Sequence, residues 1–114
     1  MKTSELTGAA LDWAVAQCEG EEVSVIRGQL ETRWTDNGWK PSTDWAQGGP
    51  IIEQKWITVE CWPNESDENM RWAGTIYDKP PLCEAMGPTP LIAAMRCYVA
   101  SVLGDEVNIP PDLI

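Results

Sequence analysis

The residues best equipped for chemistry stand together in the middle of the chain, in the segment Ser42 to Ile52, which reads STDWAQGGPII. A structural interpretation has Asp44 capping a turn, Trp45 filling the core and Gly48-Gly49 adopting positive φ angles. In a binding interpretation, the two glycines let a ligand approach the backbone. Trp45 then stacks on the ligand, and Asp44 or Gln47 gives specificity. The third interpretation is catalysis by the Asp44 carboxylate.

The composition argues against catalysis. The chain has no histidine, which excludes the commonest general acid–base and every Ser–His or Cys–His pair. Gly48-Gly49 lacks the spacing of both phosphate-binding loops, Gly-x-Gly-x-x-Gly and the P-loop. Asp44 could pair with Glu53 or Asp12, but among eighteen acidic residues such pairs arise easily. The sequence therefore assigns no catalytic residue, and enzyme activity is not expected.

Tryptophan is unusually frequent, with seven residues and no phenylalanine. A tryptophan buries a large area and carries one N–H that needs a partner. Seven in a small domain predict that some line a groove or an interface, where such side chains are favoured. The candidate binding residues are Trp34, Trp39, Thr43, Asp44, Trp45, Gln47, Gly48, Gly49, Arg71 and Arg96.

The charge is strongly acidic, with a formal net charge of −10. Direct nucleic-acid binding is not expected, because phosphate contacts need a basic surface and the eight basic residues are dispersed. The acidity is explained most simply by solubility. Attraction to a basic partner and imitation of a DNA backbone are the alternatives.

The four cysteines are scattered and form no Cys-x-x-Cys pair, so no metal site is predicted. They are expected to be reduced and mostly buried, and no cofactor is expected. No apolar run approaches the roughly 20 residues that span a bilayer. The first residues do not form a signal-peptide core. We therefore expect the protein in the cytoplasm of the cell that makes it, with no membrane association.

Hydrophobic spacing predicts a first helix over residues 4–19, ended by Gly20. Asp12 is expected to be solvated, and Trp13 lies off the apolar stripe of this helix. Residues 23–26 have strand composition, and Gly28 permits a bend. Residues 29–50 read as a long irregular loop, which is typically functional or disordered; its tryptophans need packing partners and argue against disorder.

Residues 51–62 form the longest strand candidate, and apolar residues on both of its faces predict a central strand. Residues 70–77 alternate and complete an antiparallel hairpin around an acidic, solvated loop at 63–69. A second helix is predicted to begin with Thr89 as cap and Pro90 as first residue, and to end at Gly104. Arg96 is placed away from the centre of its apolar face, and residues 105–111 are expected to be extended.

These elements predict one domain, residues 1–114, of the α+β class. Its architecture would be two helices packed on a small, mostly antiparallel sheet of three to four strands, with a long irregular loop.

Three segments taken together resemble one family. They are MKTSELTGAALDWAVA at residues 1–16, STDWAQGGPIIE at 42–53 and GPTPLIAAMRCYVAS at 87–101. In this order they resemble the NinX-like family of small tailed-phage and prophage proteins, over nearly the whole chain except residues 61–86. The resemblance implies a phage accessory protein made inside the bacterial host. It implies no activity and supplies no catalytic residue.

Three functions remain as alternatives. The preferred one is an accessory protein that binds a host or phage protein through a Trp-rich surface. Formation of a homo-oligomer is a further alternative. The second is a small-molecule or nucleotide pocket, or a minor enzyme, at the loop from Asp44 to Gly49, with Arg71 or Arg96 in its lining. The third is an acidic DNA mimic that inhibits a DNA-binding protein.

Overall fold

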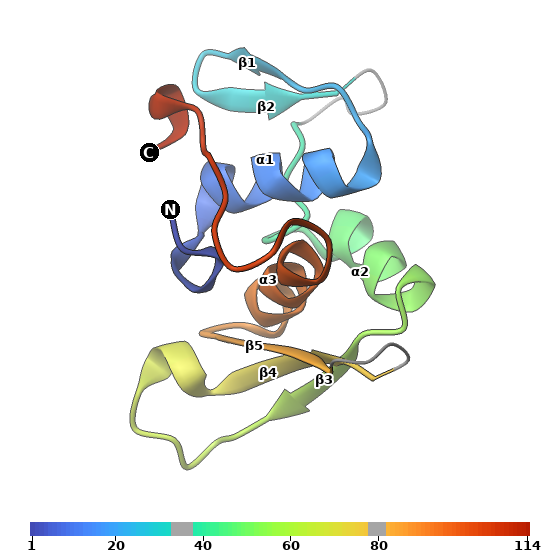
Figure 1. Ribbon diagram of the computed structural model, residues 1–114, viewed down its shortest axis with the longest axis vertical. Helices are drawn as coiled ribbons and strands as arrows, with labels where there is room; N and C mark the ends of the chain where they lie inside the picture. Colours follow the sequence, from blue (N-terminus) through green and yellow to red (C-terminus); the bar gives the residue numbers. More distant parts are fainter. Residues whose placement is uncertain (33–37, 78–81) are drawn as a thin grey trace.

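The computed structural model describes residues 1–32, 38–77 and 82–114 and shows an α+β fold built around one helix, α3 (Figure 1). Within these residues the α-helices are α1 (Gly8–Glu19), α2 (Trp45–Gln54) and α3 (Pro90–Leu103). One antiparallel hairpin pairs β1 (Ser24–Ile26) with β2 (Gln29–Glu31). A second antiparallel sheet has the order β3-β4-β5, formed by Thr58–Cys61, Trp72–Ile76 and Cys83–Gly87. Short 3₁₀-helices occupy Thr3–Glu5, Glu68–Met70 and Pro111–Leu113.

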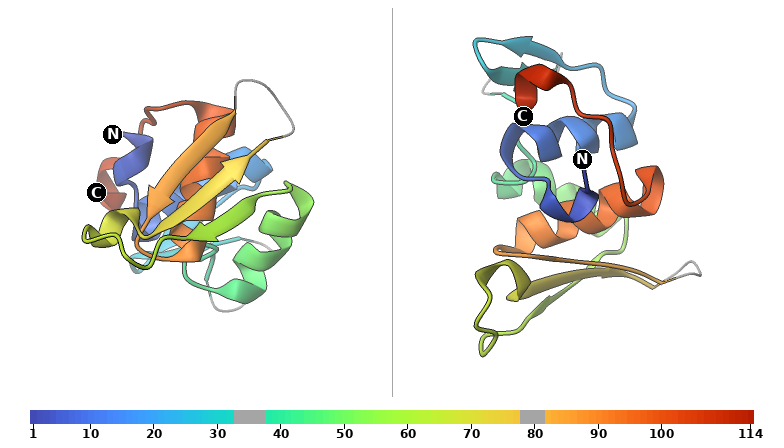
Figure 2. Two further views of the ribbon diagram at one scale, coloured as in Figure 1. Left: turned by 90° about the horizontal axis from the view of Figure 1, so that it is seen from below. Right: turned by 60° about the vertical axis from the view of Figure 1, so that its left-hand side comes forward.

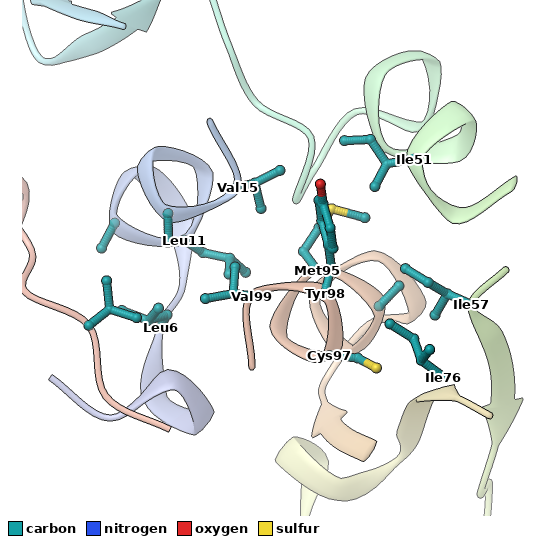
Figure 3. Packing of buried hydrophobic residues seen from close by; sticks show 14 of the residues in the cluster. Leu6, Leu11, Val15, Ile51, Ile57, Ile76, Met95, Cys97, Tyr98 and Val99 are labelled. Atoms are coloured by element: carbon teal, nitrogen blue, oxygen red, sulfur yellow. The ribbon is translucent and has the colours of Figure 1, made fainter. Parts of the chain in front are cut away.

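Helix α3 lies between two layers, with α1 on one side and the β3-β4-β5 sheet on the other (Figure 2). Figure 3 shows Leu11 and Val15 of α1 on one side of α3 and Ile57 and Ile76 on the other. Met95 of α3 is fully buried in this cluster. Because each fully buried side chain of this kind contributes roughly 1.5–3 kcal/mol, a helix buried on both sides is the main source of cohesion.

The predicted second helix is confirmed as α3. The Thr89 hydroxyl accepts a hydrogen bond from the Ile92 N–H at 3.1 Å, and Pro90 is the first helical residue. Gly104 follows the last turn with φ 88°. The first helix is also confirmed, although it begins at Gly8 and is preceded by a 3₁₀ turn; Gly20 ends it in the left-handed region.

The predicted strand over residues 51–62 is wrong in its first half. Residues 45–54 form α2, and only Thr58–Cys61 extend as β3. β3 is an edge strand, whereas β4 is central. The predicted antiparallel hairpin is confirmed, with Thr58 opposite Thr75.

The irregular segment after residue 28 holds a strand that sequence reasoning missed. β2 pairs with β1 through a two-residue turn in which Arg27 and Gly28 have φ angles of 54° and 78°. Two positive φ angles are the geometry of a type I′ hairpin turn, so the bend at Gly28 is confirmed. β5 was also not predicted. No helix in the described ranges is long and apolar enough to cross a membrane.

The four cysteines are free, and their environments differ. Cys97 is buried, Cys18 and Cys83 are half-buried, and Cys61 is exposed. Burial raises the pKa of the Cys18 and Cys97 thiols to about 12. The prediction that the thiols are mostly buried is thus confirmed only for Cys97, and it is wrong for the exposed Cys61.

We expect iodoacetamide at neutral pH to modify Cys61 first, because the thiolate is the nucleophile and Cys61 is the exposed thiol. Mass spectrometry of the folded protein against time checks this, and Cys61→Ser should remove the fast phase. Modification of Cys97 at the rate of Cys61 would contradict the burial of Cys97.

Candidate functional site

Asp44 begins α2 as its N-cap residue. Its Oδ1 accepts a hydrogen bond from the Ala46 N–H at 2.9 Å, and its backbone is extended. Such a cap satisfies one of the free N–H groups at the start of a helix. The capping role predicted for Asp44 is confirmed, but it caps a helix and not a turn.

Gln47 fixes the segment that leads into α2. Its Oε1 accepts a hydrogen bond from the Lys40 N–H at 2.8 Å, and its Nε2 donates to the Gly38 carbonyl at 2.9 Å. Both ends of the amide are therefore used on the backbone. These contacts favour the structural interpretation of Gln47 over a role in ligand specificity.

Gly48 and Gly49 are both helical, so the prediction that they supply positive φ is wrong. Gly48 is buried, and a Cβ there would clash with the Pro41 carbonyl oxygen and lie 2.6 Å from Leu91 Cδ2. Only glycine lets α2 approach this closely. Gly49 is half-buried, and a Cβ there would meet only the Trp45 ring, 4.0 Å away.

Asp12 joins α1 to the segment before α2. Its carboxylate accepts a hydrogen bond from the Ser42 N–H at 2.8 Å, and its carbonyl accepts one from Trp39 Nε1 at 2.8 Å. The expectation that Asp12 is solvated is wrong, because only 4 % of its surface is exposed. Burial raises the pKa of its carboxyl group to about 6, although the contacts with Ser42 act in the opposite direction.

Two of the candidate tryptophans can be located, and they do not converge on one site. Trp39 is half-buried against the core, beside a cavity of about 150 Å³ that is smaller than the roughly 300–1,000 Å³ of typical ligand sites. Trp45 is 56 % exposed, so it does not fill the core. Thr43 is exposed one residue before the α2 cap. Trp34 lies outside the described residues.

The two candidate arginines lie apart from these residues. Arg71 is exposed, and its Nε donates to the Glu65 carbonyl at 3.1 Å. Arg96 is 3 % exposed, which corrects its expected position away from the centre of the apolar face. Its Nε and Nη1 donate to the carbonyls of Leu6 and Met86, each at 2.9 Å.

Trp56 is the surface residue that sequence reasoning missed. It is 73 % exposed, stands two residues after α2 ends, and has a φ angle of 54°. Sequence reasoning could have found Trp56 from its position directly after an apolar helical stripe. That stripe is recognised only when residues 45–54 are read as a helix. Among the described residues, no group of three acidic or cysteine side chains lies close enough to hold a metal ion.

The chain matches the model of one protein family, described as Bacteriophage P22, NinX, over residues 2–102. Because this match covers most of the chain, the chain belongs to that family. The resemblance carried by residues 1–16, 42–53 and 87–101 is thereby confirmed, as is an association with phage. No curated protein matches the chain.

Proposed function

We propose that this member of the bacteriophage P22 NinX family acts by binding a basic protein of the phage or its host. The contact is the aromatic surface, which we define as Trp45, Ile52, Trp56 and Tyr77. The interaction takes place in the cytoplasm of the bacterial host. The observation that carries the proposal is the backbone conformation of Trp56.

Trp56 occupies a position that normally belongs to glycine. The Trp56 N–H bonds to the Glu53 carbonyl at 3.4 Å, and the Ile57 N–H bonds to the Ile52 carbonyl at 3.1 Å. This pair of bonds, with a left-handed residue between helix and strand, is the Schellman motif, whose left-handed residue is usually glycine. A bulky residue there costs roughly 1–2 kcal/mol. Strain of this kind tends to persist at functional positions, and here it holds a tryptophan ring in solvent.

The outer face of α2 continues this exposed surface. A single stripe of α2 carries Trp45, Gly49 and Ile52, which are spaced i, i+4 and i+7. Trp56 follows at i+11, just beyond the end of the helix. Gly48 and Ile51 are the buried residues of α2, and Ile52, at the edge of the stripe, is partly buried against the core. Gly49 adds no side chain between the rings, so a partner segment can approach the helix backbone there.

Tyr77 extends the surface toward the sheet. In the β3–β4 register Thr58 faces Thr75. Continuing both segments by two residues beyond this pair leads to Trp56 on one side and Tyr77 on the other. The two exposed rings, at 73 % and 62 %, therefore lie at the same end of the hairpin. Tryptophan and tyrosine supply much of the binding energy in protein interfaces, which supports recognition of a protein at this end.

The net charge of −10 favours a partner of opposite charge over a second copy of the chain. Two copies would repel each other, whereas a basic partner is attracted and oriented by the field of the protein. Asp44 and Glu53 directly neighbour Trp45 and Ile52 in the sequence, and these are the carboxylates that basic residues of a partner would meet. The side chains of Asp44 and Gln47 are hydrogen-bonded to backbone groups, so the alternative of a pocket at that loop has less support.

Trp56→Gly separates binding from folding. We expect its free energy of unfolding to equal that of the wild type or to exceed it by up to about 1 kcal/mol, because glycine relieves the left-handed strain. We expect affinity for the partner to fall by about 2 kcal/mol, or roughly thirtyfold. Unfolding in urea measures the first quantity. Quantitative mass spectrometry of proteins retained from phage-infected cells identifies the partner, and titration with the purified partner measures the second.

Val25→Ser is the matched control, since it removes an exposed apolar side chain from β1 and leaves the aromatic surface intact. The control should retain the partner. Equal recovery of the partner by wild type and Trp56→Gly would remove the aromatic surface from the interface. Self-association of the purified chain that Trp56→Gly abolishes would assign the surface to a second copy and overturn the basic partner.

A further inference from the structure

A second surface feature lies on a different part of the molecule. A pocket of about 500 Å³ is formed by the N-terminal turn, β5, α3 and the residues after α3. This volume falls within the range of small-molecule sites. The lining residues that matter here are Lys2, Glu84, Met86, Arg96, Asp105 and Glu106.

Arg96 contributes a buried cation to this pocket. Its side chain is 3 % exposed, and its two hydrogen bonds go to the backbone carbonyls of Leu6 and Met86. These contacts fix the guanidinium between the N-terminal turn and β5. The group is thus held in one orientation before any ligand arrives, which reduces the entropy lost on binding.

The charge of Arg96 has no counter-ion among the residues that the structure describes. Loss of solvation lowers its pKa, and no neighbouring carboxylate opposes that effect. A buried charge normally has an ionic partner, because removal from water is costly. A guanidinium has five N–H groups, and the two hydrogen bonds leave three of them for a ligand. Arg96 Nη2 makes neither of these hydrogen bonds, and it is not among the fully enclosed unpaired side-chain atoms of the described residues. Nη2 is therefore the part of the guanidinium that can reach the pocket.

The rim of the pocket has the opposite charge. Glu84, Asp105 and Glu106 are exposed there, and Lys2 is the exposed cation beside them. A simple anion would be attracted to Arg96 but repelled by three carboxylates. A ligand with a carboxylate at one end and an ammonium group at the other satisfies both regions. The carboxylate can form a bidentate pair with a guanidinium.

We propose that this pocket binds a small zwitterion, whose carboxylate contacts Arg96 and whose ammonium group lies at the rim formed by Glu84, Asp105 and Glu106. The site is separate from the aromatic surface and does not depend on the protein-binding proposal.

The probes are β-alanine, γ-aminobutyrate and ε-aminocaproate, compared with caproate and hexylamine, which each carry one of the two charges. NMR titration follows the Arg96 Nε–H signal and the Met86 and Lys2 amides of the full chain. We expect saturable shifts of these signals with at least one amino acid of the series, and binding at least fivefold weaker for caproate and hexylamine. Caproate binding as tightly as every amino acid would overturn the zwitterion, and so would the absence of saturable shifts from all of them.

The rim variants Glu84→Gln and Glu106→Gln test the second half of the site without disturbing the Arg96 contacts. Each should weaken the best amino acid by a factor of about three to five, the size expected for an exposed charge pair. Binding of caproate should be unchanged or stronger. Glu60→Gln, on β3 at the opposite edge of the sheet and outside the pocket lining, is the charge-matched control and should change neither. Equal affinities in all three variants would show that the rim does not contact the ligand and would overturn the proposal.

Discussion

Asp12→Asn is expected to raise the free energy of unfolding by about 2–3 kcal/mol above pH 6 and to remove most of its pH dependence between pH 4 and 7. The folded-state pKa of Asp12 is about 6, against 3.8 for an unperturbed carboxyl group. The folded protein therefore binds the proton more tightly than the unfolded chain. The stability contributed by the protonated form is fully present below pH 3.8 and is lost as the pH rises through 6. Asparagine keeps an oxygen for the Ser42 N–H and carries no charge to desolvate.

Urea unfolding followed by tryptophan fluorescence at a series of pH values checks this. Asp12→Ala should also flatten the pH profile, but it leaves the buried Ser42 N–H without its acceptor, a loss of about 1–3 kcal/mol relative to asparagine. Glu22→Gln, at an exposed position in the turn after α1, should preserve the wild-type profile. A pH profile of Asp12→Asn that parallels the wild type would show that Asp12 is not the titrating group.

The elements that sequence reasoning located correctly are those with signals close together in the chain. Thr89, Pro90 and Gly104 mark both ends of α3 without reference to any other element. The β3–β4 hairpin follows from alternation in one of its strands and a polar connection between them. Local chemistry was sufficient for these elements, and the α+β class followed from them.

Helix α2 is missed by the sequence prediction, which places residues 45–50 in the irregular loop and 51–54 in a strand, because its interior contains residues that disfavour helices. Gly48, Gly49 and Pro50 lie in three consecutive positions, and proline in a helix interior removes a hydrogen bond. What stabilises the helix is tertiary. The Asp44 cap fixes its start, and Gly48 allows contact with Leu91 of α3. A sequence window shows the unfavourable residues but not Leu91 of α3, which lies 43 positions from Gly48 in the chain.

The site residues show the same limit. Arg96 and Asp12 are charged residues that sequence reasoning expects on the surface. Both are buried because their side chains form hydrogen bonds with backbone groups that are distant in the sequence. The Arg96 guanidinium donates to the Leu6 and Met86 carbonyls, and the Asp12 carboxylate accepts from the Ser42 N–H. Trp45 is the reverse case, an apolar residue that the fold leaves exposed. Asp44 and Gln47, which the sequence marks as candidate binding residues, use their side chains in hydrogen bonds with backbone groups.

Gly74→Ala is expected to lower the free energy of unfolding by about 3 kcal/mol, the upper range for adding a methyl group to a packed core. Gly74 lies on the central strand β4, directly beneath α3. A Cβ there would lie 2.8 Å from the Ala93 carbonyl oxygen and 2.9 Å from Ala94 Cα. Both are backbone atoms, so no side-chain rotation relieves the contact and α3 itself must move. Because α3 packs against α1 as well as the sheet, the displacement disturbs both layers of the core.

Gly49→Ala is the matched control for this substitution. It adds the same methyl group on α2, where the nearest atom is the Trp45 ring at 4.0 Å. In a helix the change should stabilise the protein by roughly 0.5–1 kcal/mol, because alanine loses less conformational freedom than glycine. Urea midpoints at constant slope measure both variants. A Gly74→Ala variant as stable as Gly49→Ala would mean that α3 does not approach β4 this closely, and that the two layers can separate without loss of packing.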